Sequence, residues 1–241
     1  MTRLCCSRMS SPTAIDALVF DVIGTVVDVS GTLTRTMAAV LSGGDNEAAD
    51  AVRRWERRVD ASMQPIVADT APWRPHETLR REALDGMRRD GELPSLSDDA
   101  IETLATAVCR LDPWPESAAA LSALRERFTI IALSNADPAE LARLSRHSGL
   151  AWHAALSASY VKSYKPNAAV YRMVLEQLQL ESARSLFVAA HPWDLRAAAG
   201  HGFATAYIAR PDAEVPSPTD AFDIRVGDLG ELAVRLGARP A

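Results

Sequence analysis

The sequence predicts an α/β fold, a doubly wound, Rossmann-like parallel sheet with a helical cap domain inserted after its first strand. Short apolar runs without polar alternation are typical of parallel strands that are buried on both faces. Helical patterns separate the later runs, and this strand–helix–strand repetition indicates a doubly wound sheet. The predicted strands are ALVFDVI (17–23), FTIIALS (128–134), SLFVAA (185–190), FATAYIA (203–209) and, as a fifth, FDI (222–224).

Residues from about 30 to 112 interrupt this alternation, because helical patterns follow one another there without an apolar strand between them. We therefore predict an α/β core of residues 14–29 and 112–241, a helical cap of residues 30–111, and a disordered tail of residues 1–13. The cap helices are expected in TRTMAAVLSG, NEAADAVRRWERRVDASM, HETLRREALDGMRRD and SDDAIETLATAVCRL.

The composition is that of an ordinary soluble globular protein, with 48% hydrophobic and 24% charged residues among 241. A net charge of −5 provides no basic excess for binding nucleic acid. No run approaches the ~20 apolar residues that a membrane span requires, so no membrane partner is expected. Two of the three cysteines are adjacent and the N-terminus has no apolar signal region, so a cytoplasmic location is expected.

Polar residues gather where the predicted strands end, which is where an open α/β sheet binds its ligands. Each has a possible structural role as a turn or helix cap; Asp194, for instance, could cap the helix in DLRAAAG. Their convergence on one edge favours a catalytic site instead. The residues are Asp21 after the first strand, Ser134 and Asn135 at the end of the second, and His191, Trp193 and Asp194 after the third. Lys165 lies in the loop between the second and third strands.

In this order, D-x-x-G-T, S-N, K-P and W-D resemble the four motifs of the haloacid dehalogenase superfamily. FDVIGTVVD, LSNAD, VKSYKPNAAVY and FVAAHPWDLRAAA resemble its 2-haloacid dehalogenase branch. Phosphatases of this superfamily carry a second aspartate two residues after the first and use Mg²⁺, but Ile23 occupies that position here. The resemblance therefore implies an enzyme without metal or cofactor, in which Asp21 attacks carbon. A Mg²⁺-dependent phosphatase is a distant alternative.

The resemblance also implies a role for each site residue. Asp21 displaces the leaving group from Cα of a small 2-substituted carboxylate, Lys165 keeps Asp21 ionised, and Asp194 positions the water that hydrolyses the resulting ester to a 2-hydroxy acid. A homodimer is a further expectation from the family. The implied substrate-binding residues are Thr25, Ser134, Asn135, Tyr171 and Trp193.

Two positions depart from the branch pattern. His191 stands where the fourth motif usually has asparagine, and its role is open. Glu56 follows Trp55, where the branch has an arginine that stabilises the departing halide. On a helix, Glu56 falls inside the apolar stripe that includes Trp55, whereas Arg53 flanks it. A small slip of this alignment would instead give Arg53 the halide role.

A carboxylate at the leaving-group position favours a leaving group that is cationic or needs a proton. A strained cyclic amine meets that requirement, and a hydrolase of azetidine-2-carboxylate is known among relatives of the branch. The alternative function is therefore ring opening of L-azetidine-2-carboxylate to 4-amino-2-hydroxybutyrate, with Glu56 pairing with the ring ammonium. A third alternative is a catalytically retired protein that binds a small molecule. The presence together of Asp21, Lys165 and Asp194 argues against it.

Overall fold

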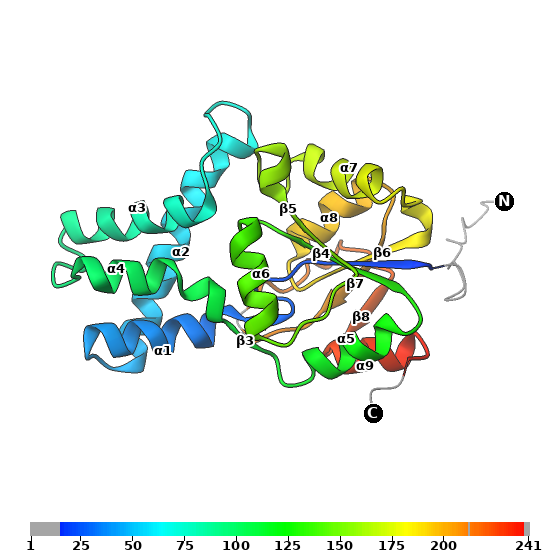
Figure 1. Ribbon diagram of the computed structural model, residues 1–241, viewed down its shortest axis with the longest axis horizontal. Helices are drawn as coiled ribbons and strands as arrows, with labels where there is room; N and C mark the ends of the chain where they lie inside the picture. Colours follow the sequence, from blue (N-terminus) through cyan, green and yellow to red (C-terminus); the bar gives the residue numbers. More distant parts are fainter. Residues whose placement is uncertain (1–14, 212, 239–241) are drawn as a thin grey trace.

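Six strands form one sheet in the order β5-β4-β1-β6-β7-β8 in the computed structural model, which describes residues 15–211 and 213–238 (Figure 1). Every neighbouring pair is parallel, and β1 lies between β4 and β6, so the chain winds outward from β1 in both directions. The predicted doubly wound fold is confirmed. The strands are β1 (Ala17–Phe20), β4 (Thr129–Ser134), β5 (Ala154–Ser157), β6 (Ser185–Ala189), β7 (Ala204–Ile208) and β8 (Ile224–Val226).

The strand predictions missed one element and misplaced the limits of others. β5, with the sequence AALS, was not predicted because alanine is a poor strand former and because this edge strand, paired only with β4, is partly exposed. The fifth predicted strand, FDI (222–224), begins at Ile224 instead. The first strand ends at Phe20 rather than at residue 23, which leaves Asp21 beyond the strand end.

Helices cover both faces of the sheet (Figure 1). The side chains of β1 alternate between these two faces and pack in two different hydrophobic clusters. Leu18 and Phe20 enter a hydrophobic cluster that includes residues of α5, α6 and α9. Ala17 and Val19 point to the opposite face and pack in a second cluster with α7 and α8. The core helices are α5 (Ser117–Arg125), α6 (Pro138–His147), α7 (Ala168–Gln177), α8 (Pro192–Gly200) and α9 (Leu229–Arg235), with short 3₁₀ helices η3 (Ala158–Val161) and η4 (Ser182–Arg184).

The helices inserted after β1 form a separate layer beside the carboxyl end of the sheet, on the left in Figure 1. A two-stranded antiparallel ribbon joins this cap to the core, with β2 (Val27–Asp28) paired to β3 (Asp112–Pro113). The Asp28 carboxylate accepts a hydrogen bond from Gly31 N at 2.8 Å and so caps the first cap helix. The cap elements are α1 (Val29–Leu41), α2 (Asp45–Val67), α3 (His76–Arg89), α4 (Asp98–Ala105) and η2 (Ala107–Arg110).

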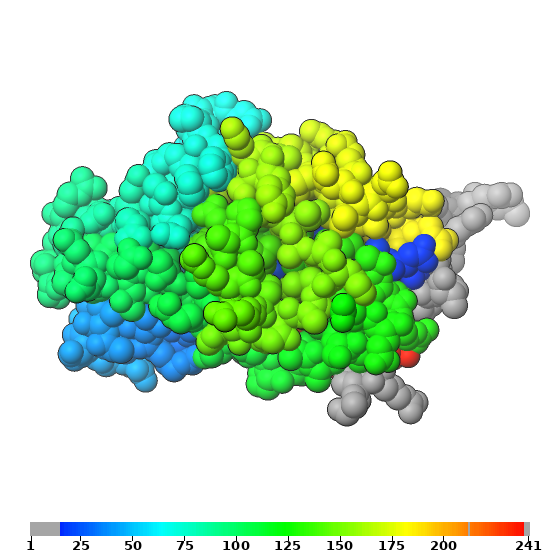
Figure 2. Space-filling view, in the orientation of Figure 1, coloured from blue at the N-terminus to red at the C-terminus, as the bar shows by residue number. Residues whose placement is uncertain are grey.

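The cap packs tightly on the core. Trp55 and Leu79 of the cap belong to the same hydrophobic cluster as the sheet residue Leu18, and Figure 2 shows the two parts in contact along their boundary on this face. Arg80 on α3 forms a buried ion pair with Glu140 on α6. The space between the cap and the strand ends is therefore enclosed by both parts of the chain. The predicted tail, residues 1–13, lies outside the described residues.

Candidate active site

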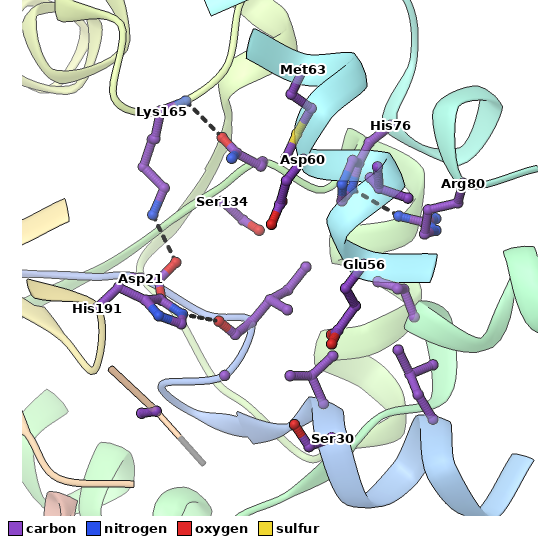
Figure 3. Close-up of a pocket in the computed structure, with 18 of the residues that line it drawn as sticks. Asp21, Ser30, Glu56, Asp60, Met63, His76, Arg80, Ser134, Lys165 and His191 are labelled. Carbon is purple, nitrogen blue, oxygen red and sulfur yellow. Dashed lines mark hydrogen bonds and ion pairs between the residues drawn. The ribbon is translucent and has the colours of Figure 1, made fainter. Parts of the chain in front are cut away.

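A cavity of about 570 Å³ lies between the carboxyl ends of the central strands and the cap (Figure 3). Its floor is made by residues at three strand ends: Asp21 after β1, Ser134 at the end of β4, and His191 after β6. These strands are neighbours in the sheet, so their ends meet at one edge although the residues are far apart in the chain.

Lys165 connects the two carboxylates that the sequence had suggested for catalysis. Its Nζ lies 2.7 Å from Asp21 Oδ1 and 2.5 Å from Asp194 Oδ2, and all three side chains are buried. Charge-assisted hydrogen bonds of this kind are short and strong, so they fix the position of the ammonium between the two acids. The Asn135 Oδ1 atom accepts a hydrogen bond from Lys165 N at 2.8 Å and so holds the loop that carries the lysine.

Asp21 is held in its ionised form. Burial by itself would raise the pKa of Asp21, but the Lys165 ammonium, with smaller contributions from His191 and Thr25, outweighs burial and lowers that pKa below its usual value. The Thr25 hydroxyl donates to Asp21 Oδ2 at 2.6 Å and accepts from Ala190 N at 2.8 Å. Thr25 therefore orients the carboxylate from the side away from the cavity, because Thr25 itself does not line the cavity.

Asp194 lies beneath Lys165 rather than on the cavity wall. Its second oxygen, Oδ1, accepts a hydrogen bond from the Tyr171 hydroxyl at 2.5 Å, so both oxygens already have strong donors. Burial raises the pKa of Asp194, although Lys165 opposes this effect. Tyr171 is fully buried behind Asp194, so the structure corrects its expected contact with substrate: its hydroxyl binds a carboxylate that faces away from the cavity.

The imidazole of His191 projects into the cavity beside the nucleophile. Its Nε2 atom is 3.6 Å from Asp21 Oδ2 and 3.1 Å from Ile23 O. The ring stacks on Trp193, with 5.7 Å between ring centroids and 18° between planes, and both residues line the cavity. Gly24, at φ +83°, makes room for it, because a Cβ atom there would be 2.9 Å from His191 Nε2.

The cap wall facing Asp21 is acidic. Glu56 and Asp60 lie one turn apart on α2 and both line the cavity (Figure 3). Burial, reinforced by the Asp60 charge, raises the pKa of Glu56 to about 7. Arg53 does not line the cavity; its exposed side chain pairs with Asp50 on the same helix. The structure thus places the glutamate, and not the arginine, opposite the nucleophile.

Two basic residues of α3 that the sequence had not suggested complete the wall. His76 and Arg80 both line the cavity, and Arg80 is held by Glu140, by Ala105 O at 3.0 Å and by His76 Nδ1 at 2.8 Å. Because arginine only donates, His76 Nδ1 must be the acceptor, and burial together with Arg80 lowers the pKa of His76 well below its usual value. No local pattern pointed to these residues. Asp60 could have been found, since it lies four residues after Glu56 on the same helix face.

The chain is similar to known proteins over most of its length. The family model for haloacid dehalogenase-like hydrolases matches residues 15–202. The chain belongs to this family. An (S)-2-haloacid dehalogenase from Xanthobacter autotrophicus is 30% identical to this chain over 204 residues, which cover 83% of this chain and 77% of the relative.

Solved structures of the branch agree with the fold. An L-2-haloacid dehalogenase named PA0810 superimposes with a TM-score of 0.84 at 30% identity and covers 92% of this chain and 99% of its own. The L-2-haloacid dehalogenase from Xanthobacter autotrophicus, solved with chloropropionic acid covalently bound, has a TM-score of 0.76 at 26% identity, with 92% and 98% covered. The predicted membership of the 2-haloacid dehalogenase branch is confirmed, and the chain is a hydrolase of this family.

The described part of the chain offers neither a metal-binding cluster nor a membrane-spanning helix. No group of three or more His, Cys, Asp or Glu side chains arranged for metal binding occurs among residues 15–211 and 213–238. None of the helices in those ranges has the length and hydropathy of a transmembrane segment.

Proposed function

We propose that this hydrolase displaces a leaving group from the Cα atom of a small 2-substituted carboxylate, with Asp21 as nucleophile and L-2-haloacids as substrates. The observation that carries the proposal is the position of the Asp21 carboxylate, which Lys165 and Thr25 hold at the wall of the cavity between the sheet and the cap. Ile23 stands where the second acid of the phosphatases would lie. A carboxylate nucleophile without that acid suits attack on carbon, where the leaving group departs in one step.

In the first step an oxygen of Asp21 forms a bond to Cα from the side opposite the leaving group. The carbon–halogen bond breaks and its electron pair leaves with the halide, so an aspartyl ester with inverted configuration results. Lys165 keeps Asp21 ionised for this attack, while Ser134 and Asn135 on the cavity wall are placed to bind the substrate carboxylate. The covalently bound chloropropionic acid of the Xanthobacter relative supports such an intermediate.

In the second step water adds to the ester carbonyl, which is Cγ of Asp21. The bond between Cγ and the ester oxygen then breaks, which releases a 2-hydroxy acid and regenerates the carboxylate with one oxygen from water. A single turnover in heavy-oxygen water should therefore label Asp21 and not the product.

A second candidate function follows from Glu56. A carboxylate with a pKa of about 7 that faces the nucleophile opposes the departure of an anion whenever it is ionised. It would instead pair with the ring ammonium of L-azetidine-2-carboxylate, and Asp60 lies one turn away to reinforce the negative wall. The same attack by Asp21 on Cα would open the ring and yield 4-amino-2-hydroxybutyrate after hydrolysis.

One parallel assay tests both candidates. The purified full chain is incubated in EDTA with L-2-chloropropionate and, separately, with L-azetidine-2-carboxylate. Chloride release and 4-amino-2-hydroxybutyrate formation are followed, with Asp21→Asn as the inactive control. Chloride release lost in the control supports the haloacid function, and ring opening without chloride release supports the second candidate.

No product from either substrate, together with no heavy-oxygen label at Asp21, would refute the proposal. A protein that has lost catalysis and binds a small molecule would then be the remaining explanation. Activity that needs added Mg²⁺ would favour the phosphatase alternative. The homodimer and the cytoplasmic location expected from the sequence stay predictions.

A further inference from the structure

The cavity is larger than the smallest substrates of the proposed reaction require. L-2-chloropropionate, a three-carbon acid, fills only a small part of about 570 Å³, a volume in the range that holds drug-sized ligands. Its carboxylate is expected at Ser134 and Asn135 and its Cα atom beside Asp21, at the strand ends. A longer substituent on Cα would extend toward the cap, so the cap wall decides which longer substrates fit.

His76 presents a fixed hydrogen-bond donor on this cap wall, across the cavity from Asp21 (Figure 3). Arginine only donates, so the 2.8 Å contact with Arg80 makes Nδ1 the acceptor and leaves the ring proton on Nε2. Burial and the Arg80 charge lower the pKa of His76, so the ring stays neutral. Nε2 has no partner among residues 15–211 and 213–238, and it is not sealed from the cavity although the residue is only 9% exposed.

The remaining contacts of the imidazole hold it in this orientation. Arg80 is itself fixed by the buried ion pair with Glu140 and by its hydrogen bond to Ala105 O at 3.0 Å. The Tyr164 ring packs against His76, with 5.7 Å between the ring centroids. A donor that is already held in place loses little conformational freedom when it binds a ligand, so its hydrogen bond contributes fully to selectivity.

We infer that His76 forms a specificity subsite, in which Nε2 donates a hydrogen bond to an uncharged carboxamide at the far end of the substrate. The inference rests on the proposed function and names the class of 2-substituted carboxylate that the cavity takes.

The charge of the cap wall selects the carboxamide among hydrogen-bond acceptors. Glu56 and Asp60 line the same cavity, so a second carboxylate on the substrate would be repelled when they are ionised. An ammonium would suit these acids but would leave the His76 donor without an acceptor. A carboxamide meets both requirements, because its carbonyl oxygen accepts from Nε2 and its NH₂ group donates to carboxylates.

Chloride release by the full chain, measured as kcat/KM, tests the subsite on two pairs of L-2-chloroacids. Each pair compares a terminal carboxamide with a hydrocarbon of the same shape. The pairs are 3-carbamoyl-2-chloropropanoate with 2-chloro-4-methylpentanoate, and 4-carbamoyl-2-chlorobutanoate with 2-chloro-5-methylhexanoate. We expect the carboxamide to be preferred about tenfold or more in at least one pair, because the hydrocarbon leaves the Nε2 donor unpaired.

Two variants assign this preference to the Nε2 donor. His76→Phe keeps a ring but removes the donor, so the preference should fall by about tenfold. His76→Gln keeps an N–H donor at a similar distance from the main chain and should retain part of the preference. The ratio of two substrates on one preparation does not depend on the amount of folded protein, so a merely structural role of His76 would leave it unchanged.

A titration that needs no turnover provides the second readout. Calorimetry of Asp21→Asn with the same four acids lacking chlorine should show tighter binding of a carboxamide than of its hydrocarbon partner.

Equal kcat/KM within both pairs, or a preference that His76→Phe keeps, would overturn the subsite even if L-2-chloropropionate releases chloride. Absence of chloride from every acid, L-2-chloropropionate included, would instead refute the haloacid function. In that case the titration still decides the subsite, since equal affinity within both pairs would overturn it.

Discussion

Replacing Glu56 with glutamine should stabilise the fold, and by an amount that depends on pH. Burial and the Asp60 charge raise the pKa of Glu56 from 4.5 to about 7. The folded chain therefore holds a proton that the unfolded chain has lost between these values, and stability falls as pH rises from about 4.5 to about 7. At about 1.4 kcal/mol per pH unit, the ionised carboxylate destabilises the folded state by about 3 kcal/mol above pH 7.

The assay is urea unfolding of the parent and of Glu56→Gln at two pH values. We expect the variant to gain about 3 kcal/mol of unfolding free energy at pH 9 and about 1 kcal/mol at pH 5, where folded Glu56 is already protonated. Glu47→Gln is the matched control, because this glutamate lies exposed on the same helix and should show no such pH-dependent gain. An equal gain at both pH values, or none at pH 9, would show that partial burial and the Asp60 charge do not destabilise the ionised Glu56 carboxylate.

Three further results are expected. If halide is the leaving group, chloride release should rise as pH falls through about 7, because Glu56 becomes neutral there. This pH dependence should vanish in Glu56→Gln. A rate in the parent that does not change across that pH range would contradict the idea that the Glu56 charge opposes halide departure. Lys165→Met removes a charge attraction on Asp21 of about 6 kcal/mol at an effective dielectric of about 20, so the pKa of Asp21 should rise. Turnover at pH 7 should then fall by more than about a thousandfold and recover in part in alkaline buffer, where Asp21 ionises again. Arg80→Met leaves Glu140 buried without its cation and should cost about 3–5 kcal/mol in urea unfolding, whereas a loss below about 1 kcal/mol would mean that the pair is not held as described.

The placement of Glu56 suggests a conflict between stability and activity in this hydrolase. A carboxylate of this pKa is costly to the folded state, so its position opposite Asp21 is better explained by the chemistry of the cavity than by packing. The same residue decides between the two candidate leaving groups. The stability and turnover measurements on Glu56→Gln therefore test one physical cause in two independent ways.

The sequence was sufficient to predict the sheet, the helical cap and most residues of the cavity floor. Apolar runs and helical periodicity are local properties of the chain, and they identified four of the six strands closely. The convergence of Asp21, Ser134 and Lys165 also followed, because parallel strands share one carboxyl edge whatever the distance between them in the chain. The helix-face argument that turned Glu56 toward the cavity depended only on a period of 3.6 residues.

Tertiary packing alone decided the rest. The contribution of His76 and Arg80 to the cavity depends on how α3 docks against α6, sixty residues away, and no local pattern encodes that contact. The order of the motifs predicted that Asp194 belongs to the site. Only the packed structure shows that Lys165 and Tyr171 donate to both of its oxygens and that its carboxylate does not line the cavity. Periodicity determines which face of an element is apolar, whereas the atoms that side chains reach depend on how distant elements fill the space between them.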